Sequence, residues 1–148
     1  MSYGYIYVAQ VAMGSNDGQT VRAFIEAERY KGPSLIIAYS QCIAHGIDIS
    51  KGMTQQDRAV KTGFWPLYRY NPESVAEGKN PLKLDSKPAS MPIEEFTNSE
   101  SRFRMLNRLD PERAKEFMQQ AQRNINARRS FYDQLAAQDY SLAAEGEG

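Results

Sequence analysis

The sequence predicts an α/β fold, in which a strand–helix–strand unit of a parallel sheet precedes a long loop, short strands and two C-terminal helices. Two uncharged apolar runs carry this prediction, YIYVAQVAM at residues 5–13 and LIIAY at residues 35–39. Continuous hydrophobic runs of this length are typical of strands that are buried on both faces of a parallel sheet. The segment between them has helical spacing, so the unit is expected to close with a right-handed crossover.

The first helix is expected to begin after Asn16, which suits the N-cap position, with Gln19 at the capping-box position. One face carries three apolar side chains and a single carboxylate at helical spacing: Val21, Phe24, Ile25 and Glu28. This pattern predicts an amphipathic helix. Gly32-Pro33 ends the helix, because glycine can adopt a left-handed conformation and proline cannot continue the helix.

The middle of the chain is expected to be a long connection over residues 40–62, with a short helix at 54–61 capped by Thr54. A dense aromatic cluster follows, FWPLYRY at residues 64–70. We interpret these aromatics as core. They are compatible with a strand at a sheet edge, because Pro66 cannot donate a ladder hydrogen bond. Residues 82–85 are predicted to form a further short strand.

Two helices are expected to close the chain. The first covers residues 92–108, and its apolar face consists of Ile93, Phe96, Phe103, Leu106 and Leu109. The second begins at Asp110-Pro111, with aspartate as cap and proline at the first helical position. Its stripe repeats at heptad-like spacing: Ala114, Phe117, Ala121, Ile125, Arg128, Tyr132 and Leu135. The other arginines are interpreted, like Arg128, as solvated: Arg102, Arg104, Arg108, Arg123 and Arg129.

Composition excludes several classes of protein. The 148 residues hold 18 Lys+Arg and 18 Asp+Glu, and this balance argues against a nucleic-acid partner. No apolar run approaches membrane-spanning length, and the first ten residues lack the features of a signal peptide. One cysteine cannot form an internal disulfide, which favours a reducing compartment. The sequence therefore predicts a cytoplasmic protein with no membrane partner.

Cys42 and His45, each the only residue of its type, fall just beyond the predicted second strand. Ligands gather at this edge of open α/β sheets. A buried structural thiol is the commoner role for a free cysteine. A thiol enzyme using Cys42 with His45 is the weaker alternative, because such pairs are usually distant in sequence. GxGxxG, Walker, HExxH and CxxC motifs are all absent, so no catalytic residue is assigned.

The stretch GPSLIIAYSQCIAHGI at residues 32–47 closely resembles the C-terminal domain of pyruvate:ferredoxin (or flavodoxin) oxidoreductases. The likeness continues through KGMTQQDRAVKTGFWPLYRYNP and GKNPLKLDSK and includes the opening SYGYIYVAQVAMGSNDGQTVRAFIEAE, so that residues 2–137 fit. The resemblance implies part of a thiamine-diphosphate-binding α/β fold. It also implies a homodimeric enzyme that converts pyruvate and coenzyme A to acetyl-CoA and CO2. Electrons would pass through iron–sulfur clusters to ferredoxin or flavodoxin.

By this resemblance, Cys42 matches the isolated cysteine that is the fourth ligand of a 4Fe-4S cluster beside the thiamine. The family's other three cysteines, and its GDG…N motif for magnesium and the diphosphate, lie upstream and are absent here. The resemblance therefore implies a C-terminal fragment that is inactive alone and whose partner is the rest of the polypeptide. The alternative is a non-catalytic remnant or interaction module of α/β class.

These expectations divide the chain into four parts. Residues 1–40 are the βαβ end of the thiamine-diphosphate-binding domain, and residues 41–90 hold the cysteine-bearing loop and the aromatic segment. Residues 91–140 form a two-helix extension. Residues 141–148 are expected to be a flexible tail.

Overall fold

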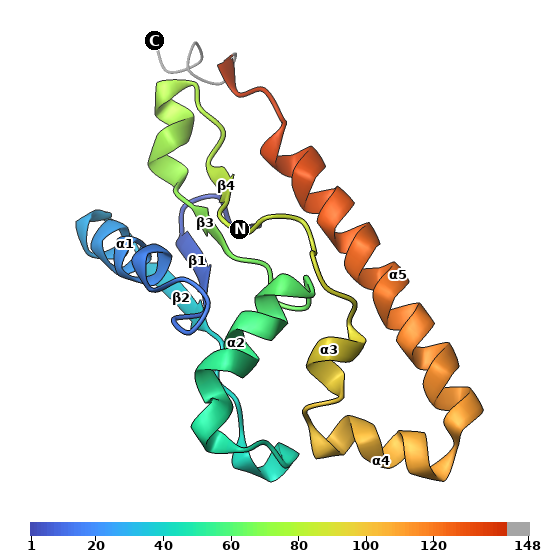
Figure 1. Ribbon diagram of the computed structural model, residues 1–148. Helices are drawn as coiled ribbons and strands as arrows, with labels where there is room; N and C mark the ends of the chain where they lie inside the picture. The colour runs from blue at the N-terminus through green and yellow to red at the C-terminus, as the bar shows by residue number, and fades with distance from the viewer. Residues whose placement is uncertain (142–148) are drawn as a thin grey trace.

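A four-stranded mixed sheet with the order β2-β1-β3-β4 organises the computed structural model, which describes residues 1–141 (Figure 1). Its strands are β1 Tyr7–Val11, β2 Ser34–Ala38, β3 Tyr68–Tyr70 and β4 Leu82–Leu84. β1 pairs in parallel with β2, whereas the other two neighbouring pairs are antiparallel. The predicted α/β class and its parallel βαβ unit are therefore confirmed.

The helices of the described part are α1 Asp17–Arg29, α2 Gly52–Lys61, α3 Glu94–Thr97, α4 Ser101–Leu109 and α5 Pro111–Ala136, with 3-10 turns η1 Ile43–His45, η2 Ile49–Lys51 and η3 Pro72–Glu77. The prediction of a single helix over residues 92–108 is wrong, because residues 98–100 form a turn that separates α3 from α4. The helix predicted at 54–61 starts two residues earlier, so Thr54 is not its cap. The tail expected at 141–148 lies, apart from Ser141, outside the described residues.

The two faces of β1 are covered by different helices, because successive side chains of a strand point to opposite faces. Tyr7, Ala9 and Val11 form a buried cluster with Ala23 of α1. Val8 points the other way and joins a cluster on which Tyr132 of α5 packs. In Figure 1, α1 and α5 accordingly lie on opposite sides of the sheet. β1 is thus the buried strand that the sequence predicts.

The apolar stripe of α1 points away from the sheet. Its N-cap is as predicted, since the Asn16 side chain accepts a hydrogen bond from the Gln19 backbone N–H at 2.9 Å. The Gln19 side chain does not complete the capping box, because it donates instead to Gln10 and Asp85. Small side chains such as Ala23 face the sheet, whereas Phe24 is 57% exposed. Small residues let the helix lie close to the strands and leave its bulky side chains outside.

The prediction that residues 35–39 form a buried strand is wrong for this chain. Among residues 1–141, β2 is the edge of the sheet and pairs only with β1, and its Leu35 is 51% exposed. Ile36 and Ile37 are partly buried, one toward each face. β2 has the composition of a central strand but the position of an edge strand.

The aromatic segment belongs to the core, as predicted. Phe64 stacks on Phe96 with ring centroids 4.5 Å apart, and Trp65 packs beside Tyr39. The edge-strand prediction is wrong, because β3 lies between β1 and β4 and Pro66 precedes it. No helix in the described residues is long and apolar enough to cross a membrane.

Candidate functional site

Cys42 lies where the chain leaves the sheet beyond the carboxyl end of β2. The last ladder bond is made by Tyr39, whose backbone N–H donates to the Val11 carbonyl at 3.0 Å. Trp65 donates its indole N–H to the same carbonyl, also at 3.0 Å, and its ring packs edge-on against Tyr39. Tyr39 and Trp65 thus fix the point of exit three residues before Cys42.

The Cys42 side chain is exposed, which contradicts the interpretation of a buried structural thiol. Its backbone is extended and caps η1, with its carbonyl accepting from the His45 N–H at 3.0 Å. This backbone bond joins the two residues, but the part of the chain that the structure describes shows no side-chain hydrogen bond between them. The thiol-enzyme alternative therefore gains no support from the geometry.

Exposed apolar side chains follow this exit point in the sequence. Ile43, next to Cys42, is 72% exposed, and Ile49 and Met53 of the same connection are also exposed. Met13, at the end of β1, is a further exposed residue, and its neighbour Gly14 lies against Met53. Apolar exposure of this kind is typical of surfaces that another polypeptide covers.

A buried carboxylate that sequence reasoning missed lies behind the loop. Glu100 is fully buried, and its side chain accepts a hydrogen bond from Gln55 at 3.0 Å and an ion-paired hydrogen bond from Arg102. Burial and the neighbouring Glu100 carboxylate raise the pKa of Tyr39 to about 12. Glu100 is 45 residues from Gln55 in sequence, so no local pattern could have indicated this contact.

A second buried network joins α1 to the strands. Arg69 of β3 donates two hydrogen bonds of 2.8 Å to Asp85 and also pairs with Glu26. Although burial alone raises the pKa of Asp85, hydrogen bonds from Arg69 and Gln19 lower it below its usual range. Burial and a hydrogen bond to Glu26 raise the pKa of Tyr7. The single guanidinium of Arg69 is shared by the carboxylates of Asp85 and Glu26, so we assign this network a structural role.

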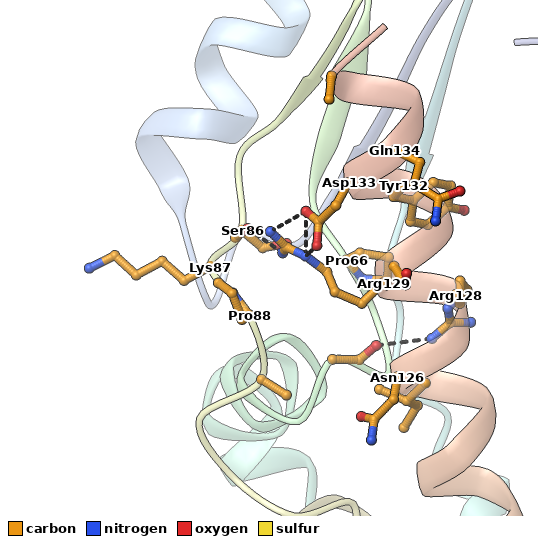
Figure 2. Close-up of a pocket in the computed structure, with 15 residues that line it drawn as sticks. Pro66, Ser86, Lys87, Pro88, Asn126, Arg128, Arg129, Tyr132, Asp133 and Gln134 are labelled. Atoms are coloured by element: carbon orange, nitrogen blue, oxygen red, sulfur yellow. Dashed lines mark hydrogen bonds and ion pairs between the residues drawn. The ribbon is translucent and has the colours of Figure 1, made fainter.

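A groove of about 610 Å³ runs between α5 and the segment that follows β4 (Figure 2). Arg129 crosses it and donates to Asp133 and to the Ser86 carbonyl, while Arg128 donates to the carbonyls of Gly63 and Phe64. Arg128 is exposed, as predicted, but it also ties α5 to the Gly63–Phe64 backbone, whereas Arg129 is partly buried and is not simply solvated. Cys42 does not line this groove.

The described residues do not form a metal centre by themselves. Within residues 1–141, no three His, Cys, Asp or Glu side chains come together in a group that could hold a metal ion. One exposed thiol at the end of a strand fits a single corner of a four-cysteine cluster. A cluster at Cys42 would need three ligands from another polypeptide segment.

The chain is similar to oxidoreductases that are several times longer. It is 53% identical over 139 residues to a pyruvate-flavodoxin oxidoreductase of Trichormus variabilis, and 47% identical over 136 residues to a pyruvate:ferredoxin oxidoreductase of Moorella thermoacetica. A probable pyruvate-flavodoxin oxidoreductase of Escherichia coli is 48% identical over 136 residues. These matches cover 92–94% of the chain but only 12% of each relative. No family model matches the chain.

Proposed function

We propose that this chain, which belongs to the pyruvate-flavodoxin and pyruvate:ferredoxin oxidoreductase family, works as one segment of such an enzyme. The enzyme would convert pyruvate and coenzyme A to acetyl-CoA, CO2, one proton and two electrons, and the electrons would reduce flavodoxin or ferredoxin. The isolated chain is expected to be inactive, because it spans about 12% of the length of its relatives.

In this proposal Cys42 is one of the four thiolate ligands of a 4Fe-4S cluster. The observation that carries it is the exposed thiol just beyond the carboxyl end of β2, three residues after the exit point at which Tyr39 and Trp65 pack together. The cluster, when bound, supplies a one-electron carrier between the site of pyruvate oxidation and the acceptor. This chain contributes one sulfur atom and the apolar surface around it, and the other segments of the enzyme contribute the remaining ligands, the thiamine diphosphate and its magnesium ion.

The exposed surfaces support docking of a larger polypeptide. β2 has an unpaired edge, and an unpaired edge invites pairing with another strand. The outer face of α1 presents Val21, Phe24 and Ile25 to solvent. An interaction module without catalytic function would use the same surfaces, so the ligand role of Cys42 is what separates the two candidate functions.

A chimaeric enzyme tests this proposal. The 139-residue stretch of the Trichormus variabilis relative that matches this chain is replaced by the corresponding residues of the chain. We expect the anaerobically purified chimaera to hold iron and acid-labile sulfide and to reduce flavodoxin with pyruvate. Cys42→Ser should remove one cluster's iron and sulfide and nearly all activity, whereas the neighbouring Ala44→Ser should change neither.

Two outcomes would contradict the proposal. An unchanged iron and sulfide content in the Cys42→Ser chimaera would exclude Cys42 as a ligand. A wild-type chimaera that assembles but lacks the cluster would favour the interaction module.

A further inference from the structure

We infer that four polar side chains, named here the polar frame, position Cys42 from both sides: Gln55, Gln56, Glu100 and Ser101. The two glutamines are neighbours on α2, and the other two residues lie at the start of α4. The inference rests on the proposed function, because the position of Cys42 matters chemically only if its thiolate is a ligand. It extends that function to residues that do not touch the metal.

The first contact holds the residue directly before Cys42. Gln56 donates from Nε2 to the side-chain oxygen of Gln41 at 3.2 Å. Its own carbonyl oxygen accepts the backbone N–H of Gly14 at 2.7 Å. One amide thus ties Gln41 to the turn that follows β1, so the Cys42 loop and that turn are held together at the carboxyl end of the sheet.

The second contact holds the point where the chain leaves the sheet. Glu100 is buried beside Tyr39, and it receives a 3.0 Å hydrogen bond from Gln55. Ser99 donates in turn to the carbonyl oxygen of the Gln55 side chain. A buried carboxylate is stable only when its charge is paired, and Arg102 pairs with it here. The same Gln55 amide also donates to the Phe96 carbonyl, and the Phe96 ring packs edge-on against Tyr39, so this network adjoins the point where the chain leaves the sheet.

The third contact lies four residues after Cys42. Ser101 donates from Oγ to the Gly46 carbonyl at 3.2 Å. Gly46 has φ +70°, and a Cβ atom built on it would lie 2.4 Å from Cβ and Oγ of Ser101. The loop can approach α4 this closely only because residue 46 is glycine. The loop is therefore anchored on both sides of Cys42, at Tyr39 and Gln41 before it and at Gly46 after it.

Such a frame suits a ligand that must meet three others from a different segment. Supporting hydrogen bonds lock ligand side chains in position, and their loss typically weakens metal binding. Because Cys42 is itself exposed, its position depends on the order of the loop around it.

A nitroxide spin label on Cys42 tests the inference in the full 148-residue chain, where it is the only cysteine. Gln56→Ala and Ser101→Ala should each raise the ratio of mobile to immobile label about fivefold, the change that one lost hydrogen bond produces. Ser101→Thr keeps the hydroxyl and should behave like the wild type. Both substituted residues are only partly buried, so the variants are expected to fold.

Gln120→Ala is the matched control, because the Gln120 amide also makes two hydrogen bonds, to Asn124 and from Arg123 on α5. Label mobility in this variant should equal that of the wild type. Unchanged mobility in both Gln56→Ala and Ser101→Ala would overturn the inference, as would an equal rise in Gln120→Ala.

The chimaeric enzyme separates this inference from the proposed function. Ser101→Ala in the chimaera should shift the electron paramagnetic resonance signal of the reduced cluster, and Ser101→Thr should restore it. A chimaera without iron would contradict the ligand role of Cys42, while the spin-label result would still decide whether the frame orders the loop. A cluster signal that neither Gln56→Ala nor Ser101→Ala alters would overturn the positioning role.

Discussion

β1 and β2 are neighbouring parallel strands of similar apolar composition, yet their surroundings differ completely. β1 is covered on both faces and paired on both edges, whereas β2 is paired on one edge and largely exposed. The side of the molecule around β1, β3, α2 and α5, called here the closed side, contains its own partners. The side formed by β2, the outer face of α1 and the Cys42 loop, called here the open side, leaves large apolar side chains in solvent. An apolar sequence therefore indicates that a strand can be buried. Whether it is buried depends on whether other parts of this chain cover it.

Two phenylalanines give the sharpest test of this difference. Phe96 is fully buried on the closed side, and Phe96→Ala should lower the free energy of unfolding by about 4 kcal/mol through lost burial and a cavity. Phe24 is exposed on α1, and Phe24→Ala should change the free energy of unfolding by less than about 0.5 kcal/mol. Urea denaturation measures both. Similar losses in the two variants would mean that the open side is also packed.

The buried charges of the closed side predict an acid-sensitive stability. Asp85→Asn should cost about 2 kcal/mol near neutral pH, because Arg69 loses a charged hydrogen-bond partner. The folded-state pKa of Asp85 lies below its ordinary value of 3.8, so this stabilisation is present above that pH and is lost as the pH falls through the folded-state pKa. Denaturation curves of the variant and the wild type should therefore converge in acid. If the difference in the free energy of unfolding between the two proteins stayed constant with pH, a lowered folded-state pKa of Asp85 would be contradicted.

Tyr39 lies at the border between the two sides, and its hydroxyl predicts an alkaline effect. Its pKa is raised from 10.0 to about 12, so the folded state favours the neutral phenol. The resulting stabilisation is complete below pH 10 and is lost as the pH rises from 10 toward 12. Tyr39→Phe should cost about 1 kcal/mol at neutral pH and show a weaker decline in stability above pH 10. Tyr3→Phe, at an exposed tyrosine, is the control and should match the wild type.

An equally small effect on stability is expected at the edge strand itself. Leu35→Lys should change the free energy of unfolding by less than about 0.5 kcal/mol, because the side chain is half exposed. A charge on an edge strand opposes pairing with other chains, so self-association measured by sedimentation should decrease. The same substitution should impair the chimaeric enzyme if β2 is covered there. Normal assembly of that chimaera would show that the edge is free.

Local signals in the sequence predicted those parts of the fold that depend on neighbouring residues. Asp110-Pro111 correctly marked the start of α5, and Asn16 the cap of α1. The exposure of β2 could not be predicted, because its apolar run has the same pattern whether or not a further segment covers it. The break between α3 and α4 was missed because the apolar spacing continues across it.

The candidate site was predictable only in part. Cys42 stood out as a lone cysteine beyond an apolar strand, although its exposure was not foreseen. The polar frame and the Arg69 network were missed, because each depends on contacts between residues more than 40 positions apart, as in Gln55–Glu100 and Arg69–Glu26. Glutamines and a glutamate on helices resemble solvated residues until the fold brings them together.

α5 gives the closed side a mechanical property that follows from its length. With 26 residues it reaches two separate core clusters, one through Ile125 beside Phe96 and the other through Tyr132 beside Tyr68. Because one continuous helix packs on both clusters, opening either cluster requires α5 to bend or to detach. Amide hydrogens of β3 and of α2 are therefore expected to exchange with solvent in one cooperative step. Cleavage of the backbone of α5 between Ile125 and Tyr132 is therefore expected to destabilise both clusters together.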